Sequence, residues 1–262
     1  MSAGPFWLGD RLVERAEAPI AGDDSAFAEG RGCYTSVRIE KGRPRFEARH
    51  LRRLARGADA LSLGRFDPER ARRALRELTA ASLPEGEGAV RLQLSRDPRG
   101  LRLTGVARAL GDDPARWSAI TAPQRHAPPP VPGGHKLTSR LVLALAAESA
   151  RAAGADEALL LDGEGRLVEA SRSNVLWVDD GDRLLSPPLA RGAVAGVALE
   201  VLRERVPIHF RDARLPALQM ARALFAVNAV RGARPIVRLD GVPVGDASHP
   251  WAARLADALA RD

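Results

Sequence analysis

A proline cluster near the middle of the chain is the sequence feature that most constrains its fold. Residues 123–134 read PQRHAPPPVPGG. A run so rich in proline forms neither a regular helix nor the interior of a sheet, and it behaves as a stiff, extended link. We therefore predict two domains, 1–122 and 135–262, joined by a linker over 123–134.

The first part of the chain shows the mixed patterns of a small α+β domain. Strands are predicted at 6–14, 32–40, 89–95 and 117–122, with a return strand that starts at Arg45 and Phe46 after a turn. Apolar residues recur at steps of three and four over 50–61, and a proline near the start opens a second such segment over 68–80. Both patterns predict helices.

The second part combines short strands with helices. A long helix is predicted over 137–153, and the glycine at 154 can end it. Closely spaced short strands and a further helix then predict a curled, barrel-like sheet. The fold class we expect is α/β with two domains, a small N-terminal one and a larger, barrel-like C-terminal one. The later elements are strands at 157–161, 168–170, 174–178 and 183–185, a helix over 196–205, strands near 208 and at 223–228 and 235–239, and a terminal helix.

The charge balance favours small anionic ligands over nucleic acid. Lys and Arg number 40 against 33 Asp and Glu, which gives a net charge of +7, yet the arginines are scattered and often alternate with acids. Aromatic residues make up only 4% of the chain, which leaves few rings for base stacking. We therefore expect no nucleic-acid partner, and we expect the excess charge to draw small anions.

Simple counts exclude several other classes. No run approaches the roughly 20 apolar residues of a membrane span, and the first residues lack the basic start and apolar core of a secretory signal. We therefore expect a cytoplasmic protein without membrane contact. The single cysteine, Cys33, excludes an intrachain disulfide and a thiolate zinc cluster, and no metal site is predicted.

The scarcity of lysine singles out one amine. The chain has Lys41, in a predicted hairpin turn, and Lys136, which follows the end of the proline-rich stretch. A lysine at a domain junction can be desolvated, and a desolvated lysine loses its charge more readily and attacks carbonyl groups. A surface lysine at the start of a helix fits the same position, so position alone leaves both interpretations open.

Three further segments have the chemistry of a cofactor site. Glu169 lies between apolar stretches, where a carboxylate needs a cation; that cation is either a protonated pyridine nitrogen or a neighbouring arginine. The small residues at 192–198 lead into a predicted helix, whose N-terminus offers N–H groups to a phosphate. His50 and Arg53 lie one helical turn apart, and a guanidinium there suits a phosphate or, equally, a solvated helix face.

Taken together, these segments resemble the class IV, or fold-type IV, pyridoxal-phosphate enzymes over nearly the whole chain. That family includes branched-chain aminotransferases, D-amino-acid transaminases and 4-amino-4-deoxychorismate lyases. The resemblance implies an enzyme that uses pyridoxal 5'-phosphate and acts as a homodimer on small amino and carboxylate substrates. The motifs keep the family's order: GRGCY at 30–34, HLRRL at 50–54, the lysine, ADEALLLD at 155–162, LVEASRSNV at 167–175, SPPL at 186–189, the loop at 192–197 and NAV at 228–230.

The resemblance also assigns roles to the candidate residues. Lys136 would carry the cofactor as an internal aldimine and serve as the base, and Glu169 would pair with the pyridine nitrogen. The predicted phosphate ligands are Arg53, the backbone N–H groups of Val197 and Ala198, and Asn228 with Ala229. The predicted substrate contacts are Tyr34, Thr35, Arg96 and Arg99; a packed strand aromatic is the alternative for the tyrosine, and a solvated loop for the two arginines.

Within the family, the sequence is most like the lyases. Thr35 and Ser36 follow Tyr34, like the small hydroxyl residues of the lyases, and residues 95–102 contain arginines but no histidine, unlike the Arg-x-His of D-amino-acid transaminases. We therefore predict a 4-amino-4-deoxychorismate lyase that releases 4-aminobenzoate and pyruvate. A class IV aminotransferase acting on branched-chain or D-amino acids is the alternative, and an inactive basic binding protein is a third. Relatives commonly have an aspartate where this chain has Arg31, which leaves the exact substrate open.

Overall fold

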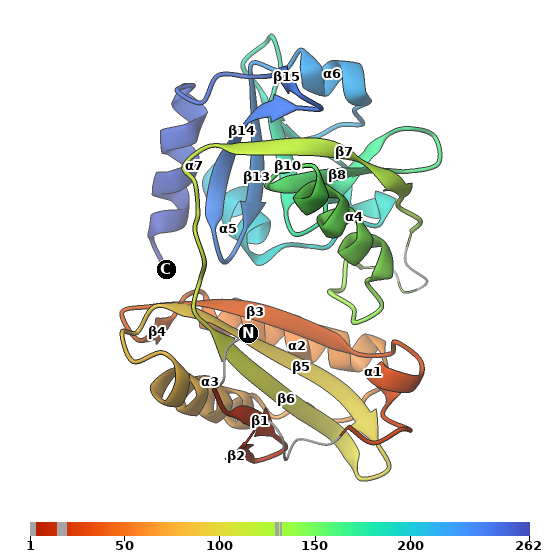
Figure 1. Ribbon diagram of the computed structural model, residues 1–262, viewed down its shortest axis with the longest axis vertical. Helices are drawn as coiled ribbons and strands as arrows, with labels where there is room; N and C mark the ends of the chain where they lie inside the picture. The colour runs from red at the N-terminus through yellow and green to blue at the C-terminus, as the bar shows by residue number, and fades with distance from the viewer. Residues whose placement is uncertain (1–3, 15–19, 129–130, 132) are drawn as a thin grey trace. The chain divides into compact units, whose positions relative to one another are not determined.

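The computed structural model describes residues 4–14, 20–128, 131 and 133–262. The chain divides into two compact units, the first comprising Met1–Asp112 with His135–Ser139, and the second comprising Asp113–Gly134 with Arg140–Asp262 (Figure 1). Each unit is built around its own sheet. The predicted α/β class, with a smaller α+β part and a larger part based on a curled sheet, is confirmed.

The first unit contains a six-stranded antiparallel sheet in the order β2-β1-β6-β5-β3-β4. Helices α2 and α3 pack against this sheet (Figure 1). The strands are β1 (Phe6–Leu8), β2 (Arg11–Val13), β3 (Cys33–Glu40), β4 (Arg43–Pro44), β5 (Gly88–Asp97) and β6 (Gly100–Arg108), and the helices are α1 (Ser25–Ala28), α2 (Glu47–Ala60) and α3 (Pro68–Ser82).

Local sequence explains why α3 forms where it does. The side chain of Asp67 accepts hydrogen bonds from the N–H groups of Glu69 and Arg70, and proline occupies the first turn. Such a cap satisfies donors that a helix start leaves without partners. Its buried positions recur at steps of three and four residues, which gives one apolar stripe that packs on the sheet; they include Ala71, Ala74, Leu75 and Leu78.

The second unit contains a nine-stranded mixed sheet in the order β12-β11-β10-β13-β14-β7-β8-β9, with β15 paired to β14. The pairs β11–β12, β14–β7 and β7–β8 are parallel. The strands are β7 (Trp117–Arg125), β8 (Glu157–Leu161), β9 (Leu167–Ala170), β10 (Asn174–Val178), β11 (Leu184–Ser186), β12 (His209–Phe210), β13 (Ala223–Asn228), β14 (Gly232–Leu239) and β15 (Val242–Pro243). The helices are α4 (Leu141–Ala152), the 3-10 turn η2 (Leu189–Arg191), α5 (Val197–Arg205), α6 (Leu215–Gln219) and α7 (Pro250–Ala260).

The core of the second unit explains why its strands read as continuous apolar runs. β8, β9 and β10 are buried at every position, so both faces of these strands must be apolar or carry partnered polar groups. The main cluster includes Trp117, Leu159, Val175, Trp177 and Leu224. None of the helices among the described residues is both long enough and apolar enough to span a membrane.

The structure corrects several predicted element boundaries. The predicted return strand at Arg45 and Phe46 is wrong: β4 comprises residues 43–44, and Phe46 takes a left-handed conformation (φ 53°) at the start of α2. The strand β6 was not predicted, because Gly105 interrupts its pattern. Packing requires that glycine, since a Cβ there would lie 2.8 Å from Leu78 and 2.9 Å from Leu92.

The proline-rich stretch and the residues after it also differ from the prediction. β7 extends to Arg125 as a strand of the second sheet, although we placed residues 117–122 in the first domain and 123–134 in a linker. The helix predicted from residue 137 begins only at Leu141, because Leu137 forms a β-bridge with Cys33. Residues 135–139 therefore belong to the first unit. Pro129, Pro130 and Pro132 lie outside the described residues.

Replacing Gly57 with alanine tests the packing of α2 on β3. A Cβ at residue 57 would lie 2.6 Å from Sγ and 2.9 Å from Cβ of Cys33. We expect Gly57→Ala to lower the free energy of unfolding by about 1–3 kcal/mol, because overpacking outweighs the higher helix propensity of alanine. Denaturant unfolding measures the change.

The double variant Cys33→Ala/Gly57→Ala should recover part of this loss, because it removes the sulfur but keeps the Cβ of residue 33, 2.9 Å from the new Cβ. Gly163→Ala is the matched control, since a Cβ there has no atom within 4 Å. A Gly57→Ala protein as stable as the wild type would contradict the packing described.

Candidate active site

In the first unit, the segment that carries Lys136 runs beside the start of β3. The N–H of Tyr34 donates to the Lys136 carbonyl at 2.9 Å, and the N–H of Thr138 donates to the Gly32 carbonyl at 2.9 Å. The Lys136 Nζ lies 5.1 Å from the centre of the Tyr34 ring. Lys136 is half-buried, whereas Lys41 is exposed in a turn. These contacts hold the backbone of Lys136 in a strand-like position rather than at the start of a helix.

Arg91, which sequence reasoning missed, contacts the same aromatic ring. Its guanidinium carbon lies 3.9 Å from the centre of the Tyr34 ring, and its Nη2 donates to Gln93 Oε1 at 3.0 Å. The tyrosine side chain is itself buried. Tyr34 pairs with Gln93, and Ser36 pairs with Arg91, so all four share one face of the sheet. The alternation of inward and outward residues in the strand predicted at 89–95 was the sequence signal that could have placed Arg91 on one face of the sheet.

Thr35 lies on the opposite face, because successive residues of a strand point to opposite sides. Its side chain is fully buried, and its Oγ1 lies 2.6 Å from Nδ1 of His50 in α2. The structure therefore does not bring Thr35 together with Tyr34, although both were predicted to contact the substrate. Its observed role is to hold the histidine beneath the sheet.

His50 is a neutral group in this environment. Burial, with Arg53 and Lys136 adding positive charge nearby, lowers the pKa of His50 to about 3. The side chain has no solvent exposure, and its Nε2 has no hydrogen-bond partner among the described residues. The predicted phosphate ligand Arg53 is half-buried on the same helix. Arg53 and Lys136 thus lie close enough to His50 for their positive charges to lower its pKa.

The other predicted substrate contacts lie near the tip of the β5–β6 hairpin. Arg96 and Arg99 are both exposed. Arg96 donates to the Ser62 carbonyl at 3.4 Å, and the N–H of Arg99 donates to Asp97 Oδ1 at 2.8 Å. Within the first unit, the structure does not place them on the Tyr34 ring, where Arg91 lies instead.

Arg31, the residue that departs from the family pattern, forms a local ion pair. It is exposed, and its Nε lies 2.6 Å from Glu29 Oε2. Because this pair is solvent-exposed, it contributes little to stability.

In the second unit, Glu169 of β9 is a buried carboxylate with one oxygen available. Its Oε2 accepts a hydrogen bond from the N–H of Val194 at 3.1 Å. Its Oε1 is buried and has no hydrogen-bond partner among the described residues, although Nε2 of His126 lies 3.3 Å from it. The polar neighbours of this carboxylate are thus a backbone amide and a histidine, and the sequence offered no reason to select His126.

The start of α5 offers backbone donors at a glycine. Gly196 caps the helix without a side-chain hydrogen bond, and Val197 and Ala198 are its first two residues. A Cβ at Gly196 would collide with Oδ1 of Asn174, whose Nδ2 donates to the Val194 carbonyl at 2.8 Å. A side chain at residue 196 is therefore excluded. The N–H groups at the helix start have no partner within the helix, and they favour an anion.

Asn228 holds the turn that follows β13. Its Oδ1 accepts hydrogen bonds from the N–H groups of Val230 and Arg231 at 2.9 and 2.8 Å, and its Nδ2 donates to Ser173 Oγ at 3.0 Å. Protein groups thus engage the asparagine side chain on both its atoms. Any contact of Ala229 with a phosphate would involve its backbone, whereas Asn228 could offer its backbone or the second hydrogen of Nδ2.

Sequence reasoning also missed Glu157, a second buried carboxylate. Its side chain has no solvent exposure and accepts hydrogen bonds from Ser171 Oγ, from Ser173 Oγ at 2.8 Å, and from the N–H of Ala158 at 3.1 Å. Burial raises the pKa of Glu157, while the hydroxyl bonds oppose that rise. These bonds brace the turn at 170–174, which links Glu169 to the following strand.

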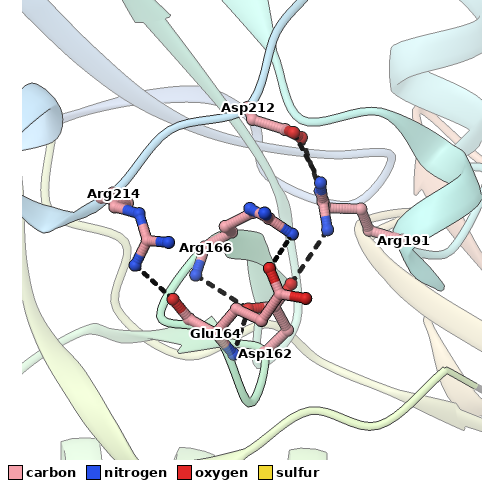
Figure 2. Close-up of polar contacts among 6 residues, drawn as sticks. All are labelled: Asp162, Glu164, Arg166, Arg191, Asp212 and Arg214. Atoms are coloured by element: carbon pink, nitrogen blue, oxygen red, sulfur yellow. Dashed lines mark hydrogen bonds and ion pairs between the residues drawn. The ribbon is translucent and has the colours of Figure 1, made fainter.

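A network of charged side chains fixes the loop before α5 (Figure 2). Arg191 in η2 donates from Nε to Asp212 at 2.5 Å and from Nη1 to Asp162 at 3.0 Å. Arg166 pairs with Glu164, and Arg214 donates to the Glu164 carbonyl. The hydrogen bonds from Arg191 lower the pKa of Asp212. The residues that lead to the α5 N-terminus are thus tied to two neighbouring loops.

Comparison with known proteins identifies the family. The family model described as amino-transferase class IV matches residues 32–239. The chain belongs to the class IV aminotransferase family. The predicted membership is therefore confirmed.

Individual relatives agree with this membership. The chain is 29% identical over 262 residues to a bifunctional aminodeoxychorismate lyase / D-amino acid transaminase of Mycobacterium tuberculosis, covering 89% of this chain and 90% of that protein. It is 28% identical over 264 residues to a D-alanine aminotransferase of Listeria innocua, covering 91% and 89%. The PLP-bound form of a hypothetical aminotransferase from M. tuberculosis has the same fold, with a TM-score of 0.82, 22% identity, and coverage of 98% and 97%.

The cofactor of this family is pyridoxal phosphate (PLP), and this chain is a PLP-dependent enzyme of class IV. The residues present fit that group. Glu169 offers a buried oxygen without a hydrogen-bond partner, as a protonated ring nitrogen requires. The start of α5 offers backbone N–H groups at a glycine where a Cβ would collide, as a phosphate requires.

The pH dependence of stability tests the environment of His50. Its pKa falls from 6.5 to about 3 on folding. Between these values the unfolded chain binds more protons than the folded one, so stability should fall as the pH drops from about 6.5 towards 3, by at most about 1.4 kcal/mol per pH unit. We expect His50→Asn to lose this part of the acid sensitivity, as measured by urea unfolding at several pH values.

His209→Asn is the matched control, because His209 is exposed in β12. That variant should follow the wild-type dependence. If His50→Asn also follows it, His50 does not remain neutral in the folded protein.

Proposed function

We propose that the chain is a PLP-dependent 4-amino-4-deoxychorismate lyase that releases 4-aminobenzoate and pyruvate. The observation that carries this proposal is the pair of cationic side chains at Tyr34, where Arg91 stacks on the ring that Lys136 also approaches. Aminodeoxychorismate is a dicarboxylate, and guanidinium groups bind carboxylates well. The lyase name of the M. tuberculosis relative supports the same assignment.

The chain's own groups would divide the work as follows. When bound, PLP supplies an electron sink for the substrate's α-carbon. The Nζ of Lys136 would hold the cofactor's aldehyde. Once the substrate's amine has displaced it, the freed Nζ would take up the α-proton as general base. Oε1 of Glu169 accepts a hydrogen bond from the ring nitrogen and keeps it protonated. Phosphate binding falls to Arg53, to the backbone N–H groups of Val197 and Ala198, and to Asn228 and the backbone at Ala229.

We assign substrate binding to residues around the Tyr34 ring. Tyr34 limits the position of the Lys136 amine, and Arg91 presents its guanidinium to a carboxylate from the same face of the sheet. Arg96 and Arg99 remain candidates for a second carboxylate, because both guanidinium groups are exposed. Thr35 is omitted from the proposed substrate contacts, because it is buried against α2.

The second candidate function is transamination of branched-chain or D-amino acids. The D-alanine aminotransferase of L. innocua and the transaminase activity named for the M. tuberculosis protein support it. Both functions use the same lysine and carboxylate, but they differ in the co-substrate that the enzyme requires. A lyase needs no keto acid acceptor, whereas an aminotransferase does.

We also propose that the chain forms a homodimer and functions in the cytoplasm. The family resemblance is the main support for the dimer. In addition, α4 exposes apolar side chains near its start, namely Leu141, Val142 and Leu145. Sedimentation equilibrium measures the mass of the assembly.

Incubation with aminodeoxychorismate in the absence of any keto acid tests the function. We expect equal amounts of pyruvate and 4-aminobenzoate over many turnovers, and no product from Lys136→Ala. Arg91→Leu should lower kcat/KM at least tenfold, because a hydrogen bond to a charged group contributes about 1.5–3 kcal/mol. Arg65→Leu, at an exposed arginine, is the matched control and should retain full activity.

One combination of results would contradict the lyase proposal. If an amino acid alone converts the bound cofactor to its amine form, and aminodeoxychorismate yields no pyruvate, the chain is an aminotransferase and not a lyase.

A further inference from the structure

Two register shifts in the second sheet lie beside the buried carboxylate of Glu169. Between β7 and β8, the chain advances from Thr121 to Arg125 on one strand but only from Leu159 to Leu161 on the other. Pro123 lies within this shift and has no N–H to donate to the ladder. Between β8 and β9 the register shifts again, next to Glu169. Such bulges re-aim side chains and are frequent next to active sites.

The first of these shifts ends at a histidine whose backbone is fixed. The N–H of His126 donates to the Leu161 carbonyl at 2.9 Å. Leu161 also pairs with Leu167 of β9. β8 thus has the His126 segment along one edge and the strand of Glu169 along the other. The His126 backbone is therefore held by the sheet, although its sequence position is in the proline-rich stretch.

The side chains of His126 and Glu169 meet in a nearly dry environment. Nε2 of His126 lies 3.3 Å from Oε1 of Glu169, and the two side chains are 10% and 5% exposed. Oε1 of Glu169 and Nδ1 of His126 have no hydrogen-bond partner among the described residues. Leaving a buried carboxylate oxygen without a donor is costly, and the imidazole nitrogen, at 3.3 Å, is close enough to supply one.

The position of the carboxylate selects one tautomer of the ring. A proton on Nε2 faces the carboxylate and is attracted, whereas a bare Nε2 would oppose its lone pairs. A proton on Nδ1 would be a buried donor without an acceptor, which is unfavourable. We therefore assign the ring proton of His126 to Nε2.

We propose that His126 is a positioning residue for Glu169, and that its Nε2–H orients the Oε1 atom. With the Val194 amide on Oε2 and His126 on Oε1, the carboxylate has a fixed direction before any ligand arrives. This inference rests on the proposed role of Glu169, which is to hold a proton on the cofactor's ring nitrogen. A carboxylate that is already oriented performs that role without first rotating.

A first experiment needs no cofactor and tests the contact alone. Nitrogen-15 NMR of the cofactor-free full-length chain should show His126 with a protonated Nε2 and a bare Nδ1. In Glu169→Gln the Nε2 proton should move upfield, because a neutral acceptor replaces a charged one. A proton on Nδ1, or an Nε2 signal unchanged in Glu169→Gln, would overturn the proposal even if the enzyme proves to be a lyase.

A second experiment measures PLP binding by absorbance titration of the cofactor-free chain. His126→Leu removes the donor and should weaken PLP binding about tenfold, since the bond lost is to a charged group. His126→Gln places an N–H near the lost one and should restore binding and the wild-type absorbance spectrum of the bound cofactor. His209→Leu, at an exposed histidine, should bind PLP like the wild type.

The possible outcomes separate the two proposals. His126→Leu with unchanged PLP affinity, or His126→Gln as impaired as His126→Leu, would overturn the role of the histidine as a donor. If the wild-type chain binds no PLP, the proposed function fails, and the NMR result alone decides whether His126 orients Glu169.

Discussion

Backbone pairing between residues 136–138 and the start of β3 is the constraint on which the proposed chemistry depends. The Tyr34 N–H bond to the Lys136 carbonyl, and the Thr138 bond to Gly32, keep this segment out of α4. The amine therefore lies over the Tyr34 ring instead of on a solvated helix. Arg91 on the same ring places a second positive charge there. The first unit thus combines one amine, one aromatic ring and one guanidinium on a rigid sheet.

The second unit keeps two carboxylates buried and oriented. Glu157 and Glu169 are both nearly inaccessible to solvent. Glu157 is fully engaged by two serine hydroxyls and a backbone amide, and it braces the turn at 170–174. Glu169 keeps one oxygen available beside His126. An uncompensated buried charge is costly, so the same burial that gives Glu169 its function requires the donors that surround it.

Most helices and strands could be predicted because their sequence patterns are local. Predictions failed where contacts with residues distant in the sequence decide a strand end or the position of a side chain. Proline at 68 and the stripe of α3 are visible in the sequence, as are the buried runs of the second sheet. The strand end of β7 was hidden because Pro123 suggested a break, whereas a register shift accommodates it. Thr35 was misplaced because the pairing of β3 with α2 decides which face is buried. Arg91 and His126 were missed because their contacts, with Tyr34 and with Glu169, join residues that are far apart in the sequence.

In the function we propose, a single amine of this chain, that of Lys136, binds the cofactor. The sequence contains only Lys41 and Lys136, so the claim can be tested without ambiguity. Reduction of the cofactor-loaded protein with borohydride, followed by peptide mapping, measures which amine is joined to PLP. We predict that the PLP-derived mass is found on the peptide with Lys136 and is absent from the peptide with Lys41. A label on Lys41, or no labelled lysine in a protein that is active with PLP, would contradict the account.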